Sequence, residues 1–530
     1  MELRRYSHLY SGSSRWVRLS FLAFALAACS FESQPEPFRF VEATIDDIHS
    51  ALRAGDTSCV DIVEGYLRRI EAYDKSTGLN AIIFTNPNAV ARAREIDERM
   101  AAGDELGSLY CIPVLLKDNF DTADMPTSGG SIALKESVPP DDAFMVRRLR
   151  EADAIVVAKT NMAEWAFSPR QTISSSYGRT ANAYDLARVP AGSSGGTASS
   201  TAASFGVIGM GSDTGNSIRG PSSHLALVGI RSTIGLTSRD GVIPLLFDRD
   251  IAGPIMRNVT DAAKVFNVVA GYDPADLYTA LGRDRLEADY TAFLDPGALQ
   301  GKRLGVLRAL VDTEDADPAV TAVFEQALAE LEAAGADIVD PVEVVNFDSH
   351  MEQGSCNRFR YDMYVYLSSL GDNAPIRDVM EVRETGQYDP HAEGGLDYFG
   401  DGPLDVHPAD REPPCPDFAD NEPRQAYLAD VVAAMDAAGV DGLLYPSWTN
   451  PPAHIDRGRE EYKGDNSQLV APDTGLPAIT VPMGYTNGNL PAGLQILGRP
   501  YSEGVLFGLA YAYEQATRHR VPPAQFPELE

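Results

Sequence analysis

Short apolar runs alternate with helical segments along most of this chain, and this alternation limits the possible folds more than any other feature. Residues 112–116 and 154–158 are strand-length runs with almost no polar residues, and they bracket a helix predicted for 142–152. Strands that are apolar on both faces are typical of sheets covered by helices on both sides. The sequence therefore predicts an α/β fold with a central β-sheet between helical layers.

The alternation of helices and short apolar strands continues to the end of the chain. Two helices are predicted within 44–75, where Thr44 and Ser58 are suitable N-caps. Residues 350–425 are the least regular part, but no clear linker interrupts the chain, so we predict one large domain over 42–530. The other expected elements are helices at 89–102, 260–270, 317–334 and 502–517, and strands at 303–307, 442–446, 477–483 and 493–498.

The first 28 residues have the features of an export signal. Residues 1–18 hold four arginines and one acidic residue, and an apolar run of ten residues follows at 19–28. That run is too short to cross a bilayer core of about 30 Å, and it is typical of a signal peptide. A short buried helix with a chance cysteine is the alternative.

The apolar run ends in Leu-Ala-Ala-Cys29, which resembles a bacterial lipobox. The resemblance implies cleavage before Cys29 and a diacylglycerol on its sulfur, and Ser30 resembles a signal for sorting to the outer membrane. Residues 29–41 are then predicted to be a tether. The protein would be exported and held on a bacterial membrane only through the lipid at Cys29, or be periplasmic or extracellular if the lipobox is not used.

Charge and cysteine spacing exclude several classes of function. The formal net charge of -32 repels phosphate backbones, so we expect no nucleic-acid partner. The five cysteines have no C-x-x-C spacing, which argues against a zinc ribbon and a thioredoxin-type motif. Cys356 and Cys415 flank an irregular stretch, and the sequence leaves open whether they pair or are buried separately.

Three short segments carry the residues best suited to chemistry. Lys117 directly follows a buried apolar run, and burial lowers the pKa of a lysine toward the range of a general base. The alternative is a lysine at a strand end whose ammonium reaches solvent. Residues 191–196 (AGSSGG) are either a flexible linker or the start of a tightly packed helix. Residues 209–221 (GMGSDTGNSIRGP) are either a turn with polar side chains and no catalytic role or a loop whose amides face an oxyanion.

Together and in this order, the three segments resemble the amidase signature family. Further similarity lies in KTNMAE (159–164), GIRSTIG (229–235), GLPAITVP (475–482) and AGLQILGRP (492–500), so the resemblance spans about 42–520. It implies a single domain with a mixed central sheet. It also implies hydrolysis of a small-molecule amide through an acyl-enzyme, with neither metal nor cofactor.

The resemblance also implies a role for each site residue. Lys117 matches the base, Ser193 matches a bridging serine that follows a cis peptide bond, and Ser217 matches the nucleophile. Asp213 and Arg219 match residues that brace the nucleophile loop. The backbone amides expected to form the oxyanion hole are those of Thr214, Gly215, Asn216 and Ser217.

Two departures from the family pattern and several alternatives remain. Ala191 and Asn216 each replace a glycine of the pattern. Residues 192–196 also satisfy G-x-S-x-G, so an α/β-hydrolase esterase that uses Ser194 is an alternative, although no strand precedes the motif. A non-catalytic secreted binding protein on the same fold is another. The export signal and the acidic charge argue against the family's tRNA-dependent amidotransferase branch.

The sequence does not identify the amide or the oligomeric state. Four aromatic residues are candidates for a substrate pocket or for ordinary packing: Tyr361, Tyr364, Tyr366 and Trp448.

Overall fold

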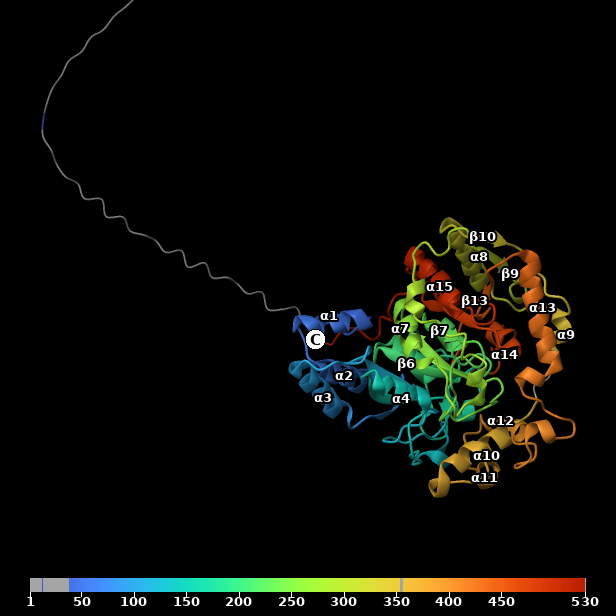
Figure 1. Cartoon of the computed structure of the whole chain (residues 1–530), viewed down its shortest axis with the longest axis horizontal. Helices are drawn as coiled ribbons and strands as arrows, with labels where there is room; N and C mark the ends of the chain where they lie inside the picture. The colour runs from blue at the N-terminus through green and yellow to red at the C-terminus, as the bar shows by residue number, and fades with distance from the viewer. Residues whose placement is uncertain (1–11, 13–37, 353–355, 530) are drawn as a thin grey trace, which may run out of the picture. The chain divides into compact units, whose positions relative to one another are not determined.

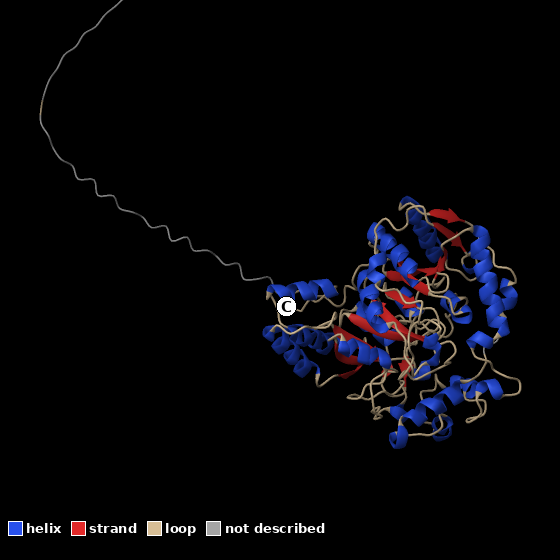
Figure 2. Ribbon diagram, in the orientation of Figure 1, coloured by secondary structure: helices blue, strands red, loops and turns tan. Residues whose placement is uncertain are grey.

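An 11-stranded sheet lies at the centre of the folded chain, and helices surround it (Figures 1 and 2). The strand order is β1-β3-β2-β6-β8-β7-β12-β13-β11-β9-β10. The group β3, β2 and β6 is parallel, as is the group β11, β9 and β10, and the other neighbouring pairs are antiparallel. The predicted mixed sheet is therefore confirmed. The strands are β1 (Ile82–Thr85), β2 (Pro113–Lys117), β3 (Ile155–Thr160), β6 (Ile208–Asp213), β7 (Val228–Arg231), β8 (Ile251–Met256), β9 (Arg303–Val306), β10 (Asp337–Val339), β11 (Gly442–Pro446), β12 (Ala478–Thr486) and β13 (Leu490–Leu497), with a separate hairpin of β4 (Ile173–Ser174) and β5 (Gly178–Arg179).

The computed structural model describes residue 12 and residues 38–352 and 356–529. Residues from Phe38 onward form one compact unit. The signal peptide predicted for 1–28, the lipidated Cys29 and most of the tether predicted for 29–41 lie outside the described residues and stay predictions. In the described ranges, no helix is both long and apolar enough to cross a membrane.

Helices pack on both faces of the sheet. α5 and α6 contact each other and lie on the strands around β6 and β7. α4, α7, α15 and α8 form a second series, in which each helix contacts the next. The helices are α1 (Ile45–Ala54), α2 (Cys59–Thr77), α3 (Ala89–Ala102), α4 (Phe144–Glu151), α5 (Gly195–Ala202), α6 (Arg219–His224), α7 (Val259–Val269), α8 (Pro318–Ala333), α9 (Phe347–Met351), α10 (Phe359–Ser369), α11 (Met380–Thr385), α12 (Glu393–Phe399), α13 (Glu422–Ala438), α14 (Ala471–Thr474) and α15 (Glu503–Thr517).

Local sequence explains where the first two helices begin. Thr44 and Ser58 are the N-caps of α1 and α2, and each forms a reciprocal capping box with an aspartate three residues later, Asp47 or Asp61. Each box satisfies two backbone donors that a helix start leaves unpaired. Both predicted N-caps are therefore confirmed.

The region 350–425, predicted to be the least regular, includes the helices α10, α11 and α12 in its described residues. They bury a second hydrophobic cluster, in which Phe359 and Met363 of α10 pack with Trp165 and Leu245. α10 also lies against the loop that leads into β8, where the Phe247 amide donates to Asp362, and near the segment after β2, where Asp121 accepts from Tyr366.

Two disulfides fasten the fold. Cys356 pairs with Cys415, which settles the alternative that the sequence left open. Cys59 pairs with Cys111, a bridge that the sequence analysis did not predict, and it links the start of α2 to the segment before β2.

Candidate active site

The three predicted chemical segments meet at one edge of the sheet. β2 and β6 are parallel neighbours, so their carboxyl ends lie side by side. Lys117 is the last residue of β2, and Asp213 is the last residue of β6. The loop from β6 to α6 carries Ser217, and the loop before α5 carries Ser193. This edge therefore gathers side chains that are far apart in the sequence.

Lys117 is fully buried among hydroxyl groups. Its Nζ donates to Ser193 Oγ at 2.7 Å and to Ser212 Oγ at 2.8 Å. Asn119 Nδ2 donates to the same Ser212 Oγ at 2.9 Å. The peptide bond between Gly192 and Ser193 is cis, as the family resemblance implied.

Burial also controls the protonation of this lysine. Removal from water lowers the pKa of Lys117 to about 7, although the carboxylates of Asp250 and Asp213 oppose the shift. A lysine with this pKa is substantially neutral near pH 7, and its lone pair can accept a proton from a hydroxyl. The arrangement thus puts a lysine of lowered pKa in direct contact with the Ser193 hydroxyl.

Ser217 is buried close to the same edge, but its hydroxyl has a different partner. Ser217 Oγ donates to Asn216 Oδ1 at 3.4 Å. Within the described ranges, Ser217 Oγ and Ser193 Oγ share no hydrogen bond. The structure thus brings Lys117 and Ser193 together directly and leaves Ser217 on the adjacent loop in another hydrogen bond.

The loop before Ser217 presents its backbone amides. For the amides of residues 214–217, no hydrogen bond to any described part of the chain is present. The next two amides differ, since those of Ile218 and Arg219 donate to Asp213 Oδ2. Four consecutive unpaired N–H groups are suited to an oxyanion.

Asp213 holds this loop through two buried arginines. Arg219 and Arg231 both donate to its carboxylate, at 3.1 Å and 2.9 Å, and all three side chains are inaccessible to solvent. Burial alone raises the pKa of Asp213, but the two guanidinium groups outweigh it and lower the pKa to about 2. The guanidinium of Arg219 also donates to the carbonyl of Gly215 in this loop. The carboxylate therefore ties β6, β7 and α6 to the loop.

Sequence and structure comparisons place the chain among known proteins. The amidase family profile matches residues 61–507. The chain belongs to the amidase family. Native peptide amidase from Stenotrophomonas maltophilia superposes with a TM-score of 0.80 at 35% identity, over 92% of this chain and 99% of that one. An amidase family protein from Bacillus anthracis gives 0.80 at 29% identity, over 91% and 92%. A glutamyl-tRNA(Gln) amidotransferase subunit from Synechococcus sp. is 34% identical over 501 residues, 91% of this chain and 100% of the relative.

The amidase is accordingly a hydrolase that acts on carbon–nitrogen bonds. The α/β-hydrolase alternative that used Ser194 is not supported. Ser194 Oγ donates to the carbonyl of Ser212 at 3.2 Å, and among the described side chains no histidine bonds to it. A serine without a histidine partner lacks the base which that mechanism needs.

Sequence reasoning missed three residues that surround the site. Ser212 lies inside the predicted segment 209–221, and Asn119 lies two residues after Lys117. Asp250 precedes β8 and is buried, and it accepts from the hydroxyl of Thr214 and the amides of Leu245 and Leu246. Nothing in the sequence links Asp250 to the site, because its contacts come from chain segments brought together by the sheet.

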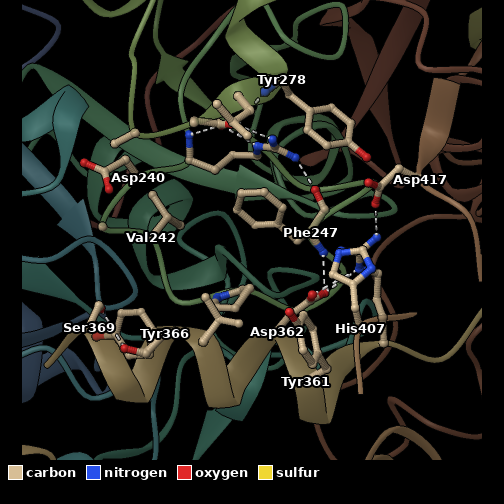
Figure 3. Close-up of a pocket in the computed structure, with 18 residues that line it drawn as sticks. Asp240, Val242, Phe247, Tyr278, Tyr361, Asp362, Tyr366, Ser369, His407 and Asp417 are labelled. Atoms are coloured by element: carbon tan, nitrogen blue, oxygen red, sulfur yellow. Dashed lines mark hydrogen bonds and ion pairs between the residues drawn. The ribbon is translucent and has the colours of Figure 1, made fainter. Parts of the chain in front are cut away.

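A pocket of about 410 Å³ lies beside α10 (Figure 3). Tyr361 and Tyr366 line it, together with Phe247 and Tyr278. Of the other aromatic candidates, Tyr364 does not line it, and Trp448 is buried against His224. The described lining of this pocket includes none of Lys117, Ser193 and Ser217, so the pocket is separate from the serine and lysine cluster.

Proposed function

We propose that the amidase cleaves a small-molecule amide with Ser217 as nucleophile, Ser193 as proton relay and Lys117 as base. The observation that carries this proposal is the 2.7 Å contact between Ser193 Oγ and a fully buried Lys117 whose pKa is lowered to about 7. Among the described residues, the partners of this ammonium are oxygens of serines, and no carboxylate bonds to it. Relay chemistry needs such a lysine, because a serine hydroxyl is a weak nucleophile at neutral pH.

In the first half of the reaction, neutral Lys117 accepts the Ser193 proton while Ser193 accepts the Ser217 proton. Ser217 Oγ then attacks the amide carbonyl and forms a tetrahedral intermediate. Because the Ser217 hydroxyl donates to Asn216 in the structure, it must first rotate toward Ser193. Ser193 next passes its proton to the leaving nitrogen and recovers a proton from Lys117, and the nitrogen departs as an amine and leaves an acyl-enzyme. Water then releases the acid by the reverse relay.

The amides of residues 214–217 are proposed to bind the oxyanion. Their lack of partners among the described residues and the bracing of their loop by Asp213 support this role. Donors fixed in advance stabilise developing charge without reorganisation, and loss of one typically costs a factor of about 10² to 10³ in kcat. We therefore assign this loop the largest share of the rate enhancement.

The substrate is proposed to be a free small amide and not one delivered on tRNA. Peptide amidase and the tRNA-dependent amidotransferase relative are similar to this chain at nearly equal identity. The net charge of -32 supports the free amide, because it opposes approach to a polyanion. An exported location, for which the N-terminal sequence argues, points the same way.

Two variants and a substrate panel test the function. Ser217→Ala is expected to abolish hydrolysis of peptide, aryl and alkyl amides while its thermal unfolding stays near that of wild type. Ser200→Ala is the matched control, since this buried hydroxyl donates to backbone carbonyls within α5. It is expected to keep full activity. Turnover by Ser217→Ala at the wild-type rate refutes the assignment.

We also propose that the amidase is exported and anchored by a lipid on Cys29. The arginine-rich segment, the short apolar run and the Leu-Ala-Ala-Cys29 sequence support this. Two disulfides in the folded part also support it, because disulfides persist in oxidising compartments.

Expression of the full chain in bacteria with labelled palmitate tests the anchor. Wild type is expected to carry the label and to sediment with outer membranes, whereas Cys29→Ser is expected to lose the label and appear in the soluble fraction. Ser30→Asp is the sorting control and is expected to stay labelled in the inner membrane. A membrane-bound, unlabelled wild type contradicts the proposal.

A further inference from the structure

Asn216 immediately precedes the proposed nucleophile and occupies a position where the family pattern has glycine. Its side chain is almost fully buried, with 1% exposed. Both polar atoms of this side chain have partners. Nδ2 donates to the carbonyl of Pro169 at 3.1 Å and to Asp465 Oδ2 at 2.9 Å, and Oδ1 accepts from Ser217 Oγ. A glycine would make none of these three bonds.

The Pro169 carbonyl has a second donor, and that donor belongs to the other serine loop. The amide of Gly192, the residue before Ser193, donates to Pro169 O at 2.8 Å. One carbonyl oxygen therefore receives hydrogen bonds from the residue before the bridging serine and from the residue before the nucleophile.

The segment around Pro169 is the support on which the Ser193 loop rests. The amide of Ala163 donates to the carbonyl of Ser193 at 3.0 Å. Thr172 Oγ1 donates to Ala191 O at 2.9 Å and accepts from the amide of Gly195 at 3.1 Å. A side chain built on Gly192 would collide with the carbonyls of Ser168 and Gln171. Residues 163–172 thus hold the Ser193 loop on both sides.

The second contact fixes the orientation of the Asn216 amide. Asp465 Oδ2 also accepts from Tyr462 Oη at 3.0 Å, so the carboxyl is held from two directions. Because Nδ2 must face Asp465 and Pro169, Oδ1 is left facing Ser217. The amide cannot flip without losing both donor bonds.

We propose that the Asn216 side chain is a positioning residue that fastens the nucleophile loop to the support of the bridging-serine loop. Through Pro169 it fixes the place of Ser217 relative to Ser193, and through its Oδ1 it holds the Ser217 hydroxyl between turnovers. This inference rests on the proposed function, since it assigns Asn216 a role toward Ser217 and Ser193.

The first test is Asn216→Gly, which restores the residue of the family pattern and keeps the backbone amide. Loss of the two donor bonds is expected to lower kcat roughly tenfold, with KM within about twofold, because hydrogen bonds of this kind each change an equilibrium several-fold. Asn86→Gly is the matched control: Asn86 is a buried asparagine whose Nδ2 donates to Val156 O at 2.8 Å, near the start of β3, whereas Lys117 pairs with Thr160 at the other end of that strand. It is expected to lower the unfolding temperature and leave kcat unchanged.

The second test is Asn216→Asp, which has the same shape but no donor. Its carboxyl would face Asp465, so one of the two must hold a proton. Tyr462, Arg219 and Asp213 are the other ionisable groups that act on Asp465. We expect the kcat of this variant to fall at high pH, where the shared proton leaves. The kcat of wild type is expected to rise with pH through 7 to a plateau. Asn216→Gly is expected to keep the wild-type profile at a lower height.

The outcomes separate the two proposals. A kcat for Asn216→Gly within twofold of wild type, or a wild-type pH profile for a folded Asn216→Asp, overturns the positioning role. Ser217→Ala, assayed in the same series, reports on the function itself. If it stays active, the nucleophile assignment has failed, whereas an inactive Ser217→Ala beside an unaffected Asn216→Gly rejects only the inference about Asn216.

Discussion

Replacing Lys117 with methionine is expected to make the amidase inactive and, near neutral pH, more stable. The lysine is fully buried, and its pKa is lowered from 10.5 to about 7. Such a group binds fewer protons in the folded protein than in the unfolded chain, so its presence opposes folding. Methionine has a similar shape and carries no charge.

The size of the effect follows from the two pKa values. The destabilisation by Lys117 is greatest below pH 7, decreases as pH rises from 7 to 10.5 and vanishes above that range. It amounts to about 4 kcal/mol at pH 7 and about 2 kcal/mol at pH 9. The bonds to Ser193 and Ser212 offset it by roughly 1 kcal/mol each. Lys117→Met is therefore expected to gain about 2 kcal/mol at pH 7 and about 0 kcal/mol at pH 9.

Urea unfolding of both proteins at pH 6, 7, 8 and 9 measures this difference. The slope with pH is the decisive quantity, because the hydrogen-bond contribution is the same at every pH. Lys463→Met is the control, since that lysine is exposed, and its effect is expected to be equal at all four values. A stability difference for Lys117→Met that does not change with pH would refute the neutral-lysine argument and the mechanism built on it.

Three further predictions follow from the same contacts. Hydrolysis by wild type is expected to slow about tenfold for each pH unit below 7, because a protonated Lys117 cannot accept a proton; a flat rate from pH 5 to 8 in a stopped assay contradicts this. Asp213→Asn leaves two buried arginines without their carboxylate and is expected to lose about 3 to 5 kcal/mol in denaturant unfolding, so a loss below about 1 kcal/mol would show that the cluster is not held by charge. The two disulfides each join cysteines that are 52 or 59 positions apart along the chain, and reducing them is expected to lower the free energy of unfolding by up to about 4 kcal/mol each. Unfolding curves that coincide with and without reductant would show no such contribution.

Elements with strong local signals were predictable from the sequence. The helix predicted at 89–102 is α3 with the same bounds, and the strand predicted at 442–446 is β11. β8 was not predicted, and its sequence explains why. Ile251–Met256 contains Gly253 and Pro254, which are both unfavourable within strands. Its pairing with β6 and β7 overrides this local preference.

The candidate site also has parts that the sequence could predict and parts that it could not. The sequence could single out Lys117, Ser193, Ser217 and the loop between Asp213 and Arg219 as candidates, because each lies within a compact motif. The contacts of Asn216 were not predictable, since Pro169 and Asp465 are 47 and 249 residues away along the chain. The Cys59–Cys111 pair escaped notice for the same reason, because a separation of 52 residues carries no pairing signal.

The charges around Lys117 explain why burial prevails over attraction. Asp213 is nearby, but Arg219 and Arg231 neutralise it, so that cluster carries one net positive charge. Burial raises the pKa of Asp250, although the Thr214 hydroxyl and two amides partly oppose this. Both carboxyls raise the pKa of Lys117, but not enough to offset its burial. By neutralising Asp213, the two arginines weaken its attraction for the ammonium, so burial can lower the pKa of Lys117 to about 7.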